Sequence, residues 1–166
     1  VTDTNTGLPT TLKYNTNTQE DMLHKRVTTV GKPKENNGLV AFTFTHLLSK
    51  VKLTVENTTA DTATDYRYTI TEIAITNANL TGDYAVAGTW SNVTTGSYSI
   101  PDITVASKTT EECAAEVLLI PGTNLVGINF KVNVEMKSGD TWKTITTTPQ
   151  EYKNVIALTA NTAYNF

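Results

Sequence analysis

Few residues of this chain could do chemistry, and their spacing does not bring them together. The 166 residues include one cysteine, Cys113, so no disulfide can form within the chain. A catalytic thiol needs a histidine or a cation beside it to lower its pKa. The neighbours of Cys113 are Glu111, Glu112 and two alanines, which predicts a structural or incidental cysteine. The two glutamates would point to opposite faces of a strand, so they do not indicate an acid–base pair.

The histidines and aspartates are equally isolated. His24 and His46 have no partner at motif spacing, and we predict a hydrogen-bonded structural role for His46. Asp61 and Asp65 come nearest to a metal-binding pattern, but they lack the clustered ligands that zinc or calcium requires. The chain also has no glycine-rich phosphate loop, nucleophile elbow or Cys-x-x-Cys motif. We therefore predict that the protein is not an enzyme and binds neither a metal nor a cofactor.

Three aromatic residues are candidates for stacking on sugar rings. Trp90 and Trp142 are predicted at or near strand ends, and Tyr98 in a loop. Exposed tryptophan and tyrosine side chains can bind glycans in this way. Large aromatic side chains also dominate protein cores, so the alternative is that both tryptophans cap the core of the fold.

The overall composition excludes some partners. The net charge is only −3, and no basic stripe is present, so we predict no nucleic-acid partner. Charged residues make up 17% of the chain, and threonine and asparagine are frequent, which is typical of a β-rich protein. No apolar run reaches the roughly 18 residues that a membrane-spanning helix needs. The sequence begins at Val1 without an initiator methionine, and we expect a longer precursor.

The stretch from Gly38 to Asn57 is the centre of the predicted fold. Apolar residues alternate at even positions before His46 and at odd positions after Ser49. Such alternation is typical of half-buried strands, and a change of phase turns the buried face over. The chain must therefore bulge, turn or change sheets at residues 46–49. A strand whose two halves serve two packed sheets is a feature of β-sandwiches.

The rest of the chain also has strand patterns rather than helical periodicity. A second change of phase falls at residues 71–72, between apolar positions 66–70 and 73–75. Residues 81–83 are predicted to form a turn, and residues 115–120 are predicted as a strand buried on both faces. Residues 91–112 are less regular, and the alternative to a loop there is a short strand around Pro101 that includes Tyr98, Ile100, Ile103 and Val105. Alternation over 128–136 predicts a strand that continues through a hairpin turn at 138–140. We predict an all-β domain with essentially no helix, formed by residues 38–166, with residues 1–37 as an extended N-terminal arm or linker.

Several segments together resemble the fimbrillin-like proteins of the Bacteroidetes, which are type V pilus subunits. The specific part is Phe42-Thr-Phe-Thr-His-Leu-Leu-Ser-Lys50 within the strand over residues 40–55, preceded by Asp21-Met-Leu-His-Lys25. Supporting segments follow in the family's order: residues 73–82, Gly88-Thr-Trp90, Glu116-Val-Leu-Leu-Ile-Pro121 and Ala160-Asn-Thr-Ala-Tyr164. The resemblance covers residues 21–166 and corresponds to the family's C-terminal domain.

The resemblance implies a transthyretin-like Greek-key β-sandwich and export to the cell surface, fimbrium or outer membrane, with a lipid anchor on the precursor. It implies a structural or adhesive fimbrial subunit that joins other subunits by β-strand donation. It also implies O-glycosylation as a candidate modification of Thr62, within Asp61-Thr-Ala63. The alternative is a monomeric surface module that binds a glycan or a host protein through Trp90, Tyr98 or Trp142.

Overall fold

The computed structural model describes residues 9–25, 42–56, 66–100, 103–104, 110–112 and 116–166, with the backbone alone described at 68–72, 103–104, 110–112 and 146–155. Within these segments there is no α-helix, and η1 (Thr16–Thr18) is a single 3₁₀ turn. The strands are β1 (Thr11–Asn15), β2 (Leu23–His24), β3 (Thr45–His46), β4 (Ser49–Lys52), β5 (Thr54–Glu56), β6 (Tyr66–Ala85), β7 (Thr89–Ile100), β8 (Ile103–Thr104), β9 (Thr110–Glu112), β10 (Val117–Leu119), β11 (Leu125–Ser138), β12 (Thr141–Ala157) and β13 (Ala163–Asn165).

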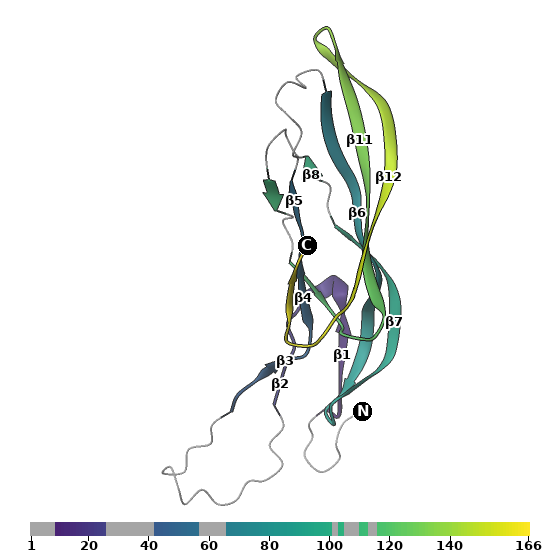
Figure 1. The fold of residues 1–166 in the computed structure, drawn as a ribbon. Helices are drawn as coiled ribbons and strands as arrows, with labels where there is room; N and C mark the ends of the chain where they lie inside the picture. The colour runs from purple at the N-terminus through teal and green to yellow at the C-terminus, as the bar shows by residue number, and fades with distance from the viewer. Residues whose placement is uncertain (1–8, 26–41, 57–65, 101–102, 105–109, 113–115) are drawn as a thin grey trace, which may run out of the picture.

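The strands form two main layers (Figure 1). The larger sheet has the order β1-β6-β11-β12, with β7 and β8 also paired to β6, and the smaller sheet has the order β10-β4-β13. Two further pairs, β2–β3 and β5–β9, continue from the smaller layer. The hairpin of β11 and β12 extends well beyond the smaller sheet. The prediction of an all-β sandwich with essentially no helix is confirmed.

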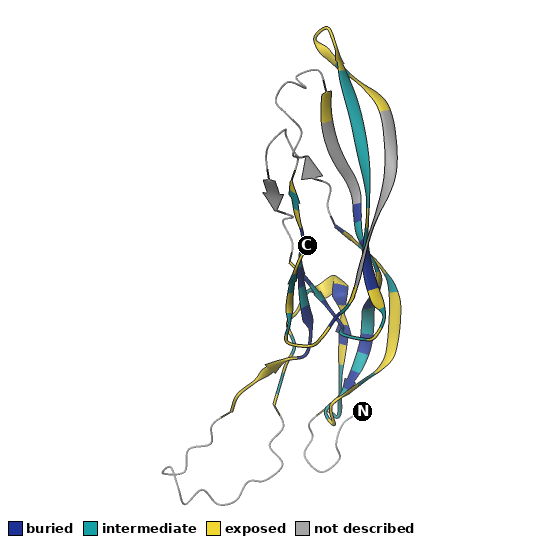
Figure 2. Ribbon diagram, in the orientation of Figure 1, coloured by how far each residue is buried: buried dark blue, intermediate teal, exposed yellow. Residues whose placement is uncertain are grey.

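The core lies between the two layers (Figure 2). The smaller sheet contributes buried residues from β4 and β10, and the larger sheet contributes residues from β6, β7 and β11. The main cluster is formed by Val51, Leu53, Ile73, Ile75, Ala78, Ile100, Val117, Leu119, Val126 and Leu158. Burial of this apolar surface, at about 25 cal/mol per Å², is the main force that holds the layers together.

The predicted change of sheets in the central stretch is confirmed. β3 pairs with β2, β4 pairs with β10 and β13, and β5 pairs with β9, so three short strands of one stretch belong to three sheets. Val51 and Leu53 at the odd positions are buried, at 1% and 4% exposure. Burial of the first half is a wrong prediction, because Phe42 and Phe44 are 56% and 59% exposed. They precede β3, which within the described residues pairs with β2 alone, so alternation there does not mark a core-facing strand.

The change of phase at residues 71–72 is also confirmed, as a bulge. β11 residue Asn129 pairs with Ala74, whereas Lys131 pairs with Thr71, so two residues of β6 oppose one residue of β11. The predicted hairpin turn is confirmed as well, since β11 ends at Ser138 and β12 begins at Thr141.

A turn at residues 81–83 is a wrong prediction, because β6 continues to Ala85 and the chain reverses at residues 86–88. Gly82 pairs with β1 and is buried, and a Cβ atom there would lie 3.0 Å from Ile120 and 3.3 Å from the Trp90 ring. This glycine therefore permits close packing between layers. The turn uses Gly88 instead, whose φ of 113° is strained for other residues. The less regular region predicted from residue 91 is likewise a strand, β7, up to Ile100.

Residues 9–25 of the predicted arm pack on the sandwich. β1 is antiparallel to the end of β6, and Tyr14 and Thr16 are buried. The Tyr14 hydroxyl donates a hydrogen bond to the Leu118 carbonyl at 2.8 Å, and the Thr16 hydroxyl donates to the Leu80 carbonyl at 2.8 Å. This part of the arm therefore joins one layer to the other. The division between an arm at 1–37 and a sandwich at 38–166 stays a prediction.

Because of Tyr14, we expect the free energy of unfolding to fall as the pH rises in the alkaline range. Burial raises the pKa of Tyr14 to about 12, from an ordinary value of 10.0. Because the folded state holds this proton more tightly, the resulting stabilisation is complete below pH 10 and is lost as the pH rises through 12. We expect Tyr14→Phe to cost about 1 kcal/mol at neutral pH through the lost hydrogen bond. Urea unfolding should show the parent's advantage over Tyr14→Phe shrinking above pH 10; a constant difference across this range would contradict the assignment.

Candidate functional site

Several residues considered from the sequence lie outside what the structure describes. Cys113, Asp61, Thr62 and Asp65 fall outside the described residues, and Glu111 and Glu112 lie in β9 with only their backbone described. Among the described residues, no group of three or more His, Cys, Asp or Glu side chains could hold a metal ion. The predictions for these positions stay predictions.

The two histidines lie on the paired strands β2 and β3. His46 Nδ1 lies 2.7 Å from a carboxylate oxygen of Asp21, a hydrogen-bonded pair in which both side chains are exposed. The His24 ring packs edge-on against Tyr84, with 5.5 Å between ring centroids. The His24 contact therefore helps to attach the β2–β3 pair to β6 of the sandwich, whereas the His46 contact joins β3 to the segment just before β2.

Trp90 is packed within an aromatic cluster. It is the second residue of β7, and its ring meets those of Tyr14 and Tyr84 in edge contacts, with centroid distances of 6.5 and 5.1 Å. Trp90 and Tyr14 belong to the second core cluster, around Tyr14, Leu48 and Ile120, and Tyr84 is buried beside them. The ring is half-buried, which leaves it only a limited surface for stacking on a sugar.

Tyr98 lies in β7 and not in a loop, so its predicted position is wrong. Tyr98 pairs with Ile75 of β6 and packs partly buried against the main core. The loop prediction failed because the antiparallel pairing with β6 holds residues 89–100 extended. The Tyr98 side chain therefore contributes to the packing of the main core.

Trp142 lies at the start of β12, next to the hairpin turn. The guanidinium carbon of Arg67 lies 4.8 Å from the centroid of its ring, a cation–π contact. Arg67 also donates to both carboxylate oxygens of Glu135, at 2.5 and 3.0 Å, and these hydrogen bonds lower the pKa of the Glu135 carboxyl. One face of the indole is thus occupied by a cation that is itself paired.

The three aromatic candidates do not converge on one site. Trp90 pairs with Tyr84 near the end of β6, whereas Trp142 follows the β11–β12 turn, beside the start of β6. Figure 1 shows these regions at opposite ends of the long strands. A shared glycan platform of the three rings is therefore not formed, and a role for any one of them in binding stays a prediction.

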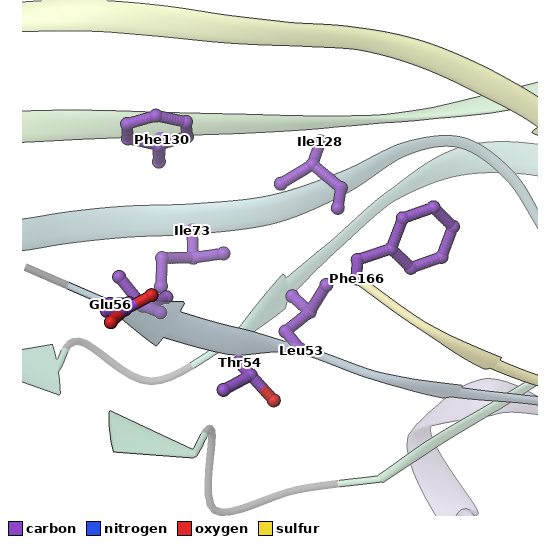
Figure 3. Close-up of a pocket in the computed structure, with 8 residues that line it drawn as sticks. Leu53, Thr54, Glu56, Ile73, Ile128, Phe130 and Phe166 are labelled. Atoms are coloured by element: carbon purple, nitrogen blue, oxygen red, sulfur yellow. The ribbon is translucent and has the colours of Figure 1, made fainter. Parts of the chain in front are cut away.

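An apolar groove lies between the two layers, near the C-terminus. It has a volume of about 590 Å³ and is open to solvent. Leu53 and Val55 line one wall, Ile73, Ile128 and Phe130 of β6 and β11 line the other, and Phe166 lies at one end (Figure 3). Thr54 and Glu56 complete the lining, and Glu56 is the one charged residue among the described residues that form it. We call these eight residues the apolar groove.

The backbone beside the apolar groove has an open edge. The Phe166 amide donates to the Lys52 carbonyl at 3.0 Å, and the Thr54 amide donates to the Phe166 carbonyl at 2.7 Å. β13 thus runs parallel to β4, and the chain end beside it bonds to β5 only at Thr54, the first residue of β5. Backbone groups two residues apart on a strand point to the same edge, so those of Glu56 point to the same side as those of Thr54. No described strand pairs with Glu56 on that side.

The sequence patterns predicted the two faces of the apolar groove but not the groove itself. Leu53 and Val55 are the odd-numbered inward positions of the central stretch, and Ile128 and Phe130 belong to the apolar face of the strand at 128–136. Whether a further strand covers these faces depends on pairing between distant segments, which local alternation does not encode.

The described residues thus form a two-layered β-sandwich with an apolar groove between the layers. A family model described as fimbrillin-like matches residues 2–166, and the chain belongs to that family. A crystal structure of a fimbrial protein from Bacteroides vulgatus ATCC 8482 is similar, with a TM-score of 0.51 and 14% identity. The likeness covers 80% of this chain and 53% of that chain, so the chain spans about half its length. At this identity the likeness shows the fold alone.

A search of curated proteins found no match. Among the described residues, no helix is long and apolar enough to cross a membrane.

Proposed function

We propose that this protein is a structural or adhesive subunit of bacterial surface fimbriae that joins other subunits by β-strand addition. Membership of the fimbrillin-like family and the fold shared with a fimbrial protein support the general role. The apolar groove supports the manner of assembly, and it is the observation that carries the proposal. The implied place of action is the cell surface, with a lipid anchor on the precursor as the link to the outer membrane.

The apolar groove has the two properties that strand addition requires. The first is an edge of β5 beside Glu56 that no described strand covers, where an added strand could form main-chain hydrogen bonds. The second is an apolar channel that takes alternate side chains, between Leu53 and Val55 on one wall and Ile128 and Phe130 on the other. Main-chain hydrogen bonds supply affinity in this mode of recognition, and the pockets for alternate side chains supply specificity.

The partner is therefore an extended segment with apolar residues at every second position, supplied by another fimbrial subunit. Each fully buried aliphatic or aromatic side chain contributes about 1.5–3 kcal/mol, and each main-chain hydrogen bond about 1 kcal/mol. Together these contributions oppose the cost of ordering the strand, which is about 1–2 kcal/mol per residue. Because the inserted strand then becomes part of a core, we expect the joined subunits to separate only on unfolding.

The proposal is tested by the heat stability of native assemblies. Surface material sheared from the producing cells is separated on a denaturing gel, with and without boiling, and this chain is detected by antibody. Strand-joined subunits should give a ladder of bands that collapses to one band after boiling. A single band at the size of the subunit in the unboiled sample would contradict assembly and would leave the monomeric glycan- or host-protein-binding module.

A further inference from the structure

Besides the two-residue β8, the larger sheet has three strands with a second edge that no described strand covers, and they differ in how that edge is protected. β1, β7 and β12 each pair with one neighbour only. β1 has 5 residues and carries Lys13. β12 has 17 residues and carries Pro149 together with Lys143 and Lys153. β7 has 12 residues and contains neither a charged residue nor a proline.

Natural proteins place lysine or proline on exposed edge strands to prevent pairing with other chains. β7 lacks that protection although most of its residues are exposed. A bulge at Asn92, whose φ is 51°, interrupts the strand in its first half. The remaining segment, residues 94–100, has the sequence Thr-Thr-Gly-Ser-Tyr-Ser-Ile. We call it the β7 edge segment.

We propose that the β7 edge segment pairs with the same segment of a second copy of this chain, in antiparallel register about Ser97. Two-fold symmetry then lets each copy offer the same edge and satisfy the other's backbone groups. The segment carries no charge, so self-pairing places no like charges opposite each other, which a lysine-bearing edge such as β1 or β12 would do.

The side chains also suit this register. Pairing about Ser97 sets Gly96 of each copy opposite Tyr98 of the other, so the smallest side chain faces the largest. Both residues lie on the inner face of the strand: Tyr98 packs on the core, and a Cβ at Gly96 would lie 2.9 Å from Leu80. On the outer face, exposed Ser97 meets its own counterpart. The surface is separate from the apolar groove, whose lining includes no residue of β7.

The proposed dimer is tested by substituting Ser97, the residue at the centre of the pairing, with a charged residue. Sedimentation velocity over a series of protein concentrations should show reversible dimers of the 166-residue chain. Ser97→Lys and Ser97→Glu should each be monomeric, because two like charges would face each other about 5 Å apart. An equimolar mixture of the two variants should dimerise again, which a misfolded variant could not do.

Ser91→Lys is the matched control, since Ser91 is exposed on the same strand but lies before the bulge. This control should dimerise as the parent does. A parent chain that stays monomeric, charge variants that dimerise unmixed, or a mixture that remains monomeric would each overturn the proposal.

Discussion

Phe130→Asp is expected to abolish the heat-sensitive ladder. Phe130 lines the apolar groove from β11 and is partly buried against the main core. In the unassembled chain the new carboxylate can stay hydrated, because the groove is open to solvent. Strand insertion would bury it without a partner, at a cost of several kcal/mol, and the aromatic contact would be lost as well. A combined loss of about 4 kcal/mol lowers the association constant roughly a thousandfold.

The matched control is Ile145→Asp. Ile145 is 50% exposed on β12, the other strand of the same hairpin, and does not line the apolar groove. The same change of charge and polarity there should leave the ladder unchanged. Phe130→Leu, which keeps an apolar lining, should also retain it. Unfolding midpoints of all three variants show whether the monomer is intact, and an undiminished ladder from a folded Phe130→Asp chain would refute the role of the apolar groove.

Leu119→Ala should cause the largest loss of stability among single truncations. Leu119 is 0% exposed and lies in β10, where it packs between the layers with residues of β4 and β6. Truncation removes apolar contacts and leaves a cavity that neighbouring strands cannot fill without moving, which costs about 2–5 kcal/mol. Small domains are stable by about 5–15 kcal/mol, so the loss is a substantial fraction of the total.

The identical substitution at an exposed position provides the comparison. Leu23 is 50% exposed on β2, and Leu23→Ala should change the free energy of unfolding by less than about 0.5 kcal/mol. Urea unfolding of both variants measures the difference as a shift in midpoint at constant slope. Equal midpoints for the two variants would show that β10 is not part of the main core.

In residues 42–56, the pattern of apolar residues predicted one feature of the structure correctly and another wrongly. The change of phase in apolar residues correctly located the point where the chain changes sheets, because a strand can bury only one parity of positions on one face. The same alternation was wrong about Phe42 and Phe44, which are exposed. Period-2 alternation records which side chains share a face, and it does not record whether another layer covers that face.

Glycine residues have two structural roles here, close packing and a turn with positive φ, and the sequence alone does not distinguish them. Gly82 was taken for a turn residue, but it lies within β6, where a Cβ atom would make tight contacts with Ile120 and Trp90. Gly88 supplies the turn through its positive φ. Tyr98 was misplaced for the same kind of reason, because pairing with β6 overrode the local signals for irregular structure.

The sequence by itself determined the β-class of the fold, the change of sheets in the central stretch, the bulge in β6, the β11–β12 turn and the resemblance to fimbrillin-like proteins. These follow from local alternation, turn residues and short motifs. Only the tertiary structure decided that the faces of Leu53 and Phe130 meet in an open groove, and that β7 has an edge that no described strand covers. Both depend on which distant strands pair, and that choice is set by the fit and burial of whole layers rather than by neighbours along the chain.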